Sequence, residues 1–348
     1  METRHLSRIK TIELPGEPLV KFDIGWVDDK TRTYYVADRS NARLAAVDVD
    51  RAEYSHSLGA GLFTGVPAVG GATAGPNGVV VLADLQQAWA GDGDSTVKII
   101  DCRSRQLLDV VHTQGEHRVD ELAYDDEDGI VLVANDQEKV PFVTLISTDP
   151  GHEVLGKVEF PQATNGLHQP VWDPGTKRFF VPVTEVGGEK AAGEIAAIDP
   201  GSMQVVASYA VRECQPAGLT VGPAGELCVG CSKNAVAAGF APRSLILDLG
   251  SGDLLARVDE VGGSDEVWYN PGDSRYYLAA SGMNGGPVLG VIDARTRTWV
   301  ENVPTAVDAH SVAADARTNR VFVPVPPDVD TPNGGVAVFE MDGSSRRD

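Results

Sequence analysis

A short hydrophobic run that ends in an acidic or polar residue returns along the chain about every fifty residues. The seven copies are Ala46-Val47-Asp48, Ile99-Ile100-Asp101, Leu145-Ile146-Ser147, Ala197-Ile198-Asp199, Ile246-Leu247-Asp248, Val291-Ile292-Asp293 and Val338-Phe339-Glu340. Their last residues lie 53, 46, 52, 49, 45 and 47 positions apart. This period is typical of a four-stranded propeller blade, which buries its faces only against neighbouring blades. Seven copies therefore predict seven blades.

Each repeat divides into four strands, named A to D from the centre outwards. Tight turns between strands A and B are predicted at Asp28–Arg32, Gly75–Gly78, Asp125–Gly129, Asp173–Lys177, Gly222–Gly225, Asn270–Ser274 and Asp315–Asn319. Strand B then follows as TYYVAD, VVVLAD, IVLVAN, RFFVPV, ELCVGC, RYYLAA and RVFVPV. Strand C carries the acidic ending, where an Asp carboxylate can accept hydrogen bonds from the backbone of the next turn.

The two ends of the chain predict how the ring closes. The last repeat stops after its third strand, near Asp342, and Ile9–Leu14 precedes the first repeat as an unassigned strand. Placing Ile9–Leu14 as the outer strand of the last blade leaves no unpaired edge between the first and last blades. We therefore predict an all-β fold, a single seven-bladed β-propeller domain over residues 1–348 with antiparallel blades. The blades are expected at about 18–60, 66–113, 117–162, 167–212, 215–260, 264–305 and 310–342, the last completed by 8–15.

Two of the A–B hairpins resemble a known repeat. The segment Asp315–Val325, DARTNRVFVPV, is similar to the repeat of the YVTN family of seven-bladed propellers, and so is Asp173–Val181, DPGTKRFFV. The resemblance covers nearly the whole chain but consists of structural positions. It implies the propeller fold and places the chain near a superfamily with cytosolic lactonases, a muconate lactone cyclase and proteins of no known reaction. A fold of this kind hosts many functions, so the resemblance selects none of them.

The charge balance narrows the possible partners. The chain has 29 Lys and Arg residues against 50 Asp and Glu, a net charge of −21. This charge repels nucleic acid and anionic membranes and attracts a cationic ligand or a metal. No segment approaches the roughly 18 apolar residues of a membrane span, and the N-terminus lacks the apolar region of a secretory signal. We expect a cytoplasmic protein with a small-molecule substrate; a monomer is compatible with the sequence, and the oligomeric state is left open.

The cysteines give no sign of a metal or redox motif. The four are Cys102, Cys214, Cys228 and Cys231, and in a cytoplasmic protein they are expected to be reduced. Cys228 and Cys231 have a CVGC spacing, but neither a second Cys pair nor a nearby His completes a zinc set.

The connections between strands differ in length between the two faces of the predicted ring. Long connections between strands B and C are expected at Gln86–Ser95, Asp136–Val140, Glu185–Gly193, Ser232–Pro242, Gly282–Gly286 and Pro326–Gly334. They share a face with the D–A connections, whereas the A–B turns are short and lie on the opposite face. Long loops on a rigid scaffold often carry binding and catalytic residues, so the first face is the predicted functional face.

Ionisable residues gather where strand A begins on that face. Alignment of the seven repeats on the A–B turn places Asp23, Gly70, Asp120, His168, Ala217, Asp265 and His310 at one level. The next level holds Ile24, Gly71, Glu121, Gln169, Gly218, Glu266 and Ser311. Three Asp and two His crowded at a narrow opening repel one another and lose hydration. A divalent cation such as Mn, Fe, Zn or Ca would relieve both costs. The alternatives are an acid–base pocket without metal and a channel lined by water.

Our first hypothesis is a metal-dependent enzyme that acts on a small carbonyl or carboxylate metabolite. The predicted metal ligands are His168, His310, Asp23, Asp120 and Asp265, with both His residues also counted as catalytic. Glu121 or Glu266 would act as general base in a lactonase or other hydrolase, or in a lyase or isomerase built from the same parts. The rival hypothesis is a non-catalytic propeller that binds a protein or small ligand on its loop-rich face.

Further polar and aromatic residues are weaker candidates. The end of strand B is predicted to carry Asp38, Asp84, Asn135 and Cys231, with the cations Arg39, Arg43, Lys139, Lys190 and Lys233 beyond it. Such cations could hold a carboxylate or stabilise an oxyanion. Trp26, Trp172 and Trp268 are expected to pack in the core, and Trp89 is expected in a long B–C loop, where it could cover a ligand.

Overall fold

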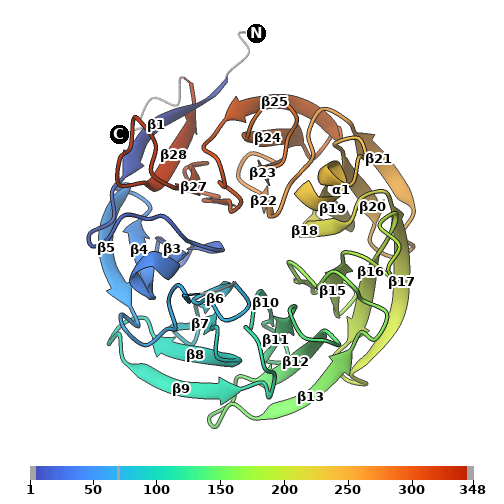
Figure 1. Ribbon diagram of the computed structural model, residues 1–348, viewed down its shortest axis with the longest axis horizontal. Helices are drawn as coiled ribbons and strands as arrows, with labels where there is room; N and C mark the ends of the chain where they lie inside the picture. Colours follow the sequence, from blue (N-terminus) through green and yellow to red (C-terminus); the bar gives the residue numbers. More distant parts are fainter. Residues whose placement is uncertain (1–4, 69–70, 343–348) are drawn as a thin grey trace.

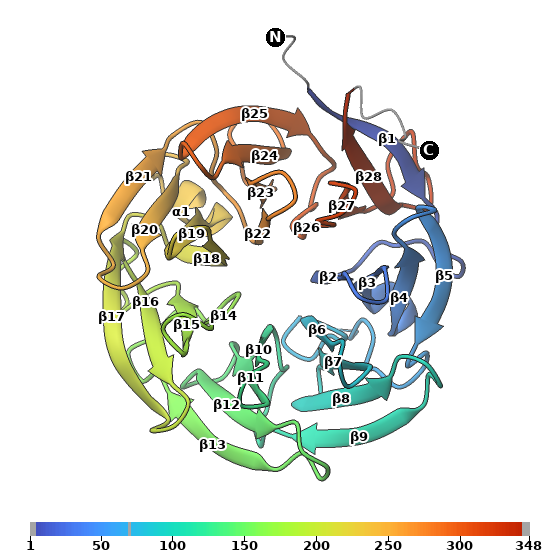
Figure 2. The ribbon, with the colours of Figure 1, turned by 180° about the vertical axis from the view of Figure 1, so that it is seen from behind.

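The computed structural model describes residues 5–68 and 71–342, which form a ring of sheets around a central axis (Figure 1). Within these residues the strands assemble into seven four-stranded antiparallel sheets, as the repeat predicts. The first strand of each sheet lies nearest the axis and the fourth lies at the rim, as both faces of the ring show (Figure 2). The predicted seven-bladed propeller is therefore confirmed.

Each blade consists of four strands that follow one another from the axis outwards. The first three blades contain β2 (Gly25–Asp28), β3 (Thr33–Asp38), β4 (Arg43–Asp48) and β5 (Glu53–Leu58); β6 (Val79–Leu82), β7 (Gln87–Gly91), β8 (Thr96–Asp101) and β9 (Leu107–His112); β10 (Leu122–Asp125), β11 (Ile130–Asn135), β12 (Phe142–Ser147) and β13 (Val154–Glu159). The next three contain β14 (Val171–Asp173), β15 (Arg178–Val183), β16 (Ala192–Asp199) and β17 (Gln204–Arg212); β18 (Pro216–Gly222), β19 (Glu226–Cys231), β20 (Ser244–Asp248) and β21 (Leu254–Val258); β22 (Val267–Asn270), β23 (Arg275–Ala280), β24 (Val288–Asp293) and β25 (Thr298–Pro304). The last contains β26 (Ala313–Ala314), β27 (Val321–Val325), β28 (Gly335–Met341) and β1 (Leu6–Ile12). The short helices η1 (Arg39–Asn41) and α1 (Lys233–Ala237) follow β3 and β19.

The middle strands of each blade are apolar because neighbouring blades cover both of their faces. Every residue of β3 is buried, and so is every residue of β12 except the last, which is half-buried. In contrast, most residues of the outer strand β9 are exposed or half-buried. Apolar clusters fill the spaces between blades. Tyr34 of the first blade, for example, stacks on Phe322 of the last with ring centroids 5.0 Å apart. Packing between blades therefore holds the ring together.

The ends of the chain close the ring as predicted. β1 pairs antiparallel with β28 and becomes the outer strand of the last blade, with Ile12 opposite Val336 (Figure 1). Leu6 and Ile12 point into the core and are 4% and 5% exposed, whereas Ile9 is 45% exposed. One blade thus joins the first and last strands of the fold.

The acidic residues that end the third strand of a blade cap the turns that follow. Asp101 accepts hydrogen bonds from the backbone N–H of Arg103 (3.1 Å) and Ser104 (2.5 Å). Asp248 and Asp293 accept the equivalent bonds in their own blades. The role predicted for these Asp residues is therefore confirmed.

The second blade differs from its prediction. VVVLAD contains β6, the innermost strand, and not the second strand of the blade; the segment Gln86–Ser95 contains β7 rather than a long loop. Trp89 lies on β7, is fully buried and donates from Nε1 to Gln87 Oε1 (2.9 Å), so its predicted position in a loop over a ligand is wrong. The sequence QAWAG has few β-branched residues, which is why propensity did not reveal a strand.

The cysteines also differ from expectation. Cys214, just after β17, forms a disulfide with Cys231 at the end of β19, whereas Cys102 and Cys228 are free thiols. The prediction that all four are reduced is therefore wrong. Among the described residues, no helix is long and apolar enough to cross a membrane.

Candidate functional site

A cavity of about 310 Å³ lies among the residues that precede the innermost strands, and we call it the mouth cavity. Its charged and imidazole side chains include Asp23, Arg39, Arg118, His168, Lys233, Asp265 and His310. Most of these residues come just before β2, β10, β14, β22 or β26, and the rest follow β3 or β19. The cavity therefore lies on the face with the long connections and brings together four of the five predicted metal ligands.

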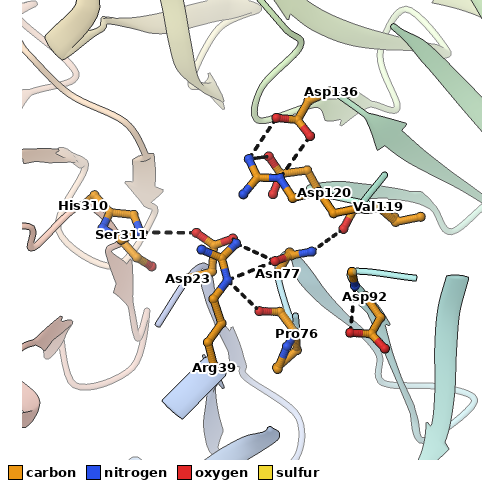
Figure 3. Close-up of polar contacts among 12 residues, drawn as sticks. Asp23, Arg39, Pro76, Asn77, Asp92, Val119, Asp120, Asp136, His310 and Ser311 are labelled. Carbon is orange, nitrogen blue, oxygen red and sulfur yellow. Dashed lines mark hydrogen bonds and ion pairs between the residues drawn. The ribbon is translucent and has the colours of Figure 1, made fainter. Parts of the chain in front are cut away.

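Asp23 and His310 form the best-defined pair in the mouth cavity. His310 Nε2 lies 3.2 Å from Asp23 Oδ1 (Figure 3), and Nδ1 lies 2.6 Å from the carbonyl oxygen of Asp308. Both ring nitrogens therefore face acceptors, an arrangement that suits the imidazolium form. The ring also stacks on Phe22, with centroids 5.0 Å apart.

Asp23 and His310 shift each other's pKa. Burial alone would disfavour the charged form of either group, but hydrogen bonding and charge outweigh burial at both. Arg39, His310 and Arg118 hold the pKa of Asp23 well below its usual range. Asp23, Asp265 and the carbonyl of Asp308 raise the pKa of His310 above its ordinary value. The pair therefore favours a carboxylate beside an imidazolium.

This shift predicts how stability depends on pH. The raised pKa of His310 gives stability that is complete below its ordinary value of 6.5 and is lost as pH rises through the higher value in the folded state. His310→Gln should destabilise the protein by roughly 1–2 kcal/mol at about pH 6 and by less at about pH 9. Urea unfolding across this range measures the difference. His112→Gln, an exposed site on β9, is the control, and a pH-independent loss in His310→Gln would contradict the assignment.

Arg39 and Asn77 complete the surroundings of Asp23. Arg39 forms an ion pair with Asp23 and donates hydrogen bonds to Asn77 Oδ1 and to the carbonyl of Pro76 (Figure 3). Asn77 Nδ2 donates to the carbonyl oxygen of Val119 at 2.7 Å, which ties the second blade to the third. Asn77, and not Gly70 as predicted, occupies the position of the second blade that is equivalent to Asp23 in the first, because the prediction took β6 for the second strand of this blade. Gly70 itself lies outside the described residues.

Arg118 serves two carboxylates from neighbouring loops. Its guanidinium lies 2.7 Å from Asp120 and 2.8 Å from Asp136. Burial, with Asp136 and Asp23 nearby, raises the pKa of Asp120 well above its usual range despite Arg118. The pKa of Asp136 is lowered, because Arg118 and Gln137 outweigh its burial. One guanidinium can balance only one of the two charges, so ionisation of one carboxyl opposes ionisation of the other.

His168 and Asp265 face each other more loosely. His168 Nδ1 and Lys233 Nζ each lie 3.9 Å from an oxygen of Asp265. No hydrogen bond joins the His168 ring to another described residue, although the ring is largely buried at 22% exposure. His168 therefore has ring nitrogens available to a ligand in the mouth cavity.

The predicted metal site finds no support in this arrangement. Among residues 5–68 and 71–342, no group of three or more His, Cys, Asp or Glu side chains is placed to hold a metal ion. Asp23 and Asp120, two of the predicted ligands, face guanidinium groups instead. The metal therefore stays a prediction.

Some residues at the second level of the alignment accept hydrogen bonds that join blades, whereas one has no hydrogen-bond partner for its side chain among the described residues. Glu266 accepts a hydrogen bond from Val312 N–H (2.8 Å), and Gln169 Oε1 accepts from Leu219 N–H (2.8 Å) and Val267 N–H (3.1 Å). These bonds link Gln169 to the next two blades and Glu266 to the last blade. Glu121, in contrast, is 5% exposed and has no hydrogen bond from its carboxyl to another described residue.

Glu121 and Glu266 line a second cavity of about 260 Å³, which we call the channel cavity. It lies along the innermost strands, and its other lining side chains include Trp26, Tyr124, Trp172 and Trp268. In the sixth blade Asp265 lines the mouth cavity, and the residues that follow it line the channel cavity. The three Trp residues pack against the core, as expected, but they also form the wall of this cavity.

The weaker candidates are mostly structural. Arg43 pairs with Asp38 at 2.9 Å, and Asp84 lies in the β6–β7 turn on the opposite face, where it pairs with Lys30. The residue that follows the second strand of this blade, β7, is Asp92, which pairs with Lys98 at 2.8 Å. Lys139 and Lys190 do not line the mouth cavity, whereas Lys233 does. Sequence reasoning missed Arg118, although its place two residues before Asp120 was a usable signal.

Comparison with known proteins supports the fold alone. No family model and no curated protein matches the chain, so the resemblance to the YVTN family is unconfirmed. A solved structure of Kuenenia stuttgartiensis hydrazine synthase matches with 14% identity over 97% of this chain and 98% of that chain, at a TM-score of 0.72. A mitotic checkpoint complex structure matches with 12% identity over 95% and 93%, at a TM-score of 0.69. A synthase and a checkpoint complex share this architecture, which therefore does not define a function.

Proposed function

We propose that the protein is an enzyme that acts on a small carboxylate-bearing metabolite in the mouth cavity. The observation that carries the proposal is His310, which Asp23 and Asp308 hold with both ring nitrogens facing acceptors beside a cavity shared with His168. A group with a raised pKa and a second imidazole with available nitrogens form an acid–base pair.

The roles follow from the surroundings of each group. His310 is the general acid: a leaving oxygen replaces Asp23 Oδ1 as the acceptor of the Nε2–H group and takes this proton as its bond to the acyl carbon breaks. His168 is the general base that accepts a proton from water, with Asp265 nearby to stabilise the imidazolium that forms. Lys233, at 48% exposure and 3.9 Å from its nearest carboxylate, is available to hold a substrate carboxylate.

Hydrolysis of a small lactone or ester is the reaction we propose first. Elimination or isomerisation would use the same acid and base, so these remain the alternative reactions. The base is reassigned from Glu121 or Glu266 to His168, because the two Glu residues line the channel cavity. A small molecule is the proposed partner; the cytoplasmic location stays a prediction, and the disulfide is unusual for a reducing compartment.

The test is turnover of a panel of small lactones, esters and hydroxy acids by the purified protein. His310→Gln and His168→Gln are expected to lower kcat at least about 100-fold. Lys233→Ala is expected to raise KM with kcat little changed, and His112→Gln is the control. Binding of carboxylates without turnover of any member would favour the non-catalytic propeller, and full activity in either His variant would refute the assigned roles. Metal analysis of the same samples tests the predicted ion separately.

A further inference from the structure

The channel cavity contains two carboxyl groups without a compensating cation. Glu121 and Glu266 line it, and no Lys, Arg or His is among the described residues that do so. Two further polar side chains of the lining already form hydrogen bonds: Gln169 bonds to backbone groups of the next two blades, and Thr220 Oγ1 accepts from Tyr269 N–H at 3.3 Å. The mouth cavity, in contrast, balances its carboxylates with Arg39 and Arg118. The two cavities therefore favour ligands of different charge.

Aromatic rings form much of the wall around these carboxylates. Trp26, Trp172 and Trp268 line the cavity, and Trp26 meets Trp268 edge to face with centroids 5.3 Å apart. A cation over the face of a Trp ring is attracted by the ring quadrupole, and Trp is the strongest of the aromatic residues in this respect. In the described chain the protein's own cation–π pairs, at Tyr54 and Phe142, lie elsewhere. The rings of the channel are therefore available to a ligand cation.

Two buried polar groups at this cavity lack partners. Glu121 is 5% exposed, and its carboxyl accepts no hydrogen bond from another described residue. Trp172 Nε1 is buried and has no acceptor among the described residues. Buried polar groups are nearly always hydrogen-bonded, and those that are not often mark a ligand site. Here a ligand could present positive charge to the carboxyl of Glu121.

An organic cation suits the cavity better than a metal ion. Ca²⁺ takes six to eight oxygen ligands, and Mg²⁺ requires a near-ideal octahedron. The cavity offers two carboxyl groups, one of which already accepts from Val312 N–H. Its volume of about 260 Å³ lies just below the roughly 300–1,000 Å³ of pockets for drug-sized ligands. The shape and chemistry fit a small ligand with charge spread over methyl groups.

We propose that the channel cavity binds a small methylated ammonium ion, held by Glu121 and Glu266 against the rings of Trp26, Trp172 and Trp268. This site is separate from the mouth cavity and does not depend on the proposed enzymatic function. The net charge of −21 would raise the local concentration of such a cation.

The probe is choline, compared by calorimetric titration with 3,3-dimethylbutan-1-ol, which has nearly the same shape and no charge. Choline is expected to bind at least ten times more tightly than the alcohol. Glu121→Gln should weaken choline binding at least tenfold and leave binding of the alcohol unaffected. Asp128→Asn, which removes an exposed carboxylate from the next turn of the same blade, should change nothing.

The substitution Trp172→Leu tests whether the ligand binds within the channel cavity. It should weaken choline binding, whereas Trp299→Leu on the outer strand β25 should not. His310→Gln should leave choline binding unchanged, so a failure of the mouth proposal and a failure of this one are distinguishable. Equal binding of choline and the alcohol, no binding of choline, wild-type affinity in Glu121→Gln, or displacement of choline by Ca²⁺ or Mg²⁺ would each overturn the proposal.

Discussion

Deletion of residues 1–12 is expected to leave the ring open and to yield aggregated protein. The deletion removes β1, so β28 loses its antiparallel partner and becomes an unprotected edge strand. It also removes Leu6 and Ile12 from the apolar clusters that join the last blade to its neighbours. Size-exclusion chromatography and thermal unfolding of the deletion variant measure the effect. A monomer that unfolds at the wild-type temperature would show that β1 is dispensable.

Two substitutions within β1 separate loss of the core from loss of the strand. Ile12→Asp should lower the free energy of unfolding by at least about 3 kcal/mol, because a buried Ile is lost and an unpaired carboxylate is buried. Ile9→Asp, on the exposed face of the same strand, should cost less than about 1 kcal/mol. Similar losses from both variants would contradict the burial pattern of β1.

The architecture was predictable because the sequence repeat indicates how distant segments of the chain are arranged in space. Blades meet only their neighbours, so a period near fifty residues and an unassigned strand at Ile9–Leu14 sufficed to predict the ring and its closure. The error in the second blade has a local cause. VVVLAD resembles the second strand of the other blades, whereas the true second strand, QAWAG, is poor in β-branched residues.

The candidate site was predictable in position but not in its pairing. The register of the repeat placed Asp23, His168 and His310 around one opening, and all three line the mouth cavity. Which side chains meet depends on how far a long side chain reaches between blades. Arg39 reaches from beyond β3 to Asp23 and to the next blade, and Arg118 joins two loops. A sequence pattern does not encode such contacts, so carboxylates partnered by guanidinium groups resembled metal ligands.

The disulfide was missed because a cytoplasmic protein was expected, and its cysteines were therefore expected to be reduced. Cys228 and Cys231 lie on one strand, whereas the β18–β19 hairpin places Cys231 opposite Pro216, two residues after Cys214. Hairpin register was therefore the signal that could have identified the bond.

Loss of the Cys214–Cys231 disulfide is expected to lower the free energy of unfolding by about 3 kcal/mol, the value for a loop of roughly 15 residues. The two residues are 17 apart in sequence, and both are fully or almost fully buried. Urea unfolding of Cys214→Ala/Cys231→Ala, and of wild type with and without reductant, measures the loss. Cys102→Ser is the control, because its stability should still fall when the disulfide is reduced.

The same bond should affect the mouth cavity. Ser232 follows Cys231 directly, its N–H donates to the carbonyl of Cys214 at 3.1 Å, and its side chain caps α1, which begins at Lys233. Without the disulfide, Lys233 should be held less firmly, so reduction should raise KM for a carboxylate substrate more than it lowers kcat. Thiol titration of the denatured protein, purified without reductant, should find two thiols rather than four. Four thiols would show that the bond does not form, and both expected effects of reduction would then be absent.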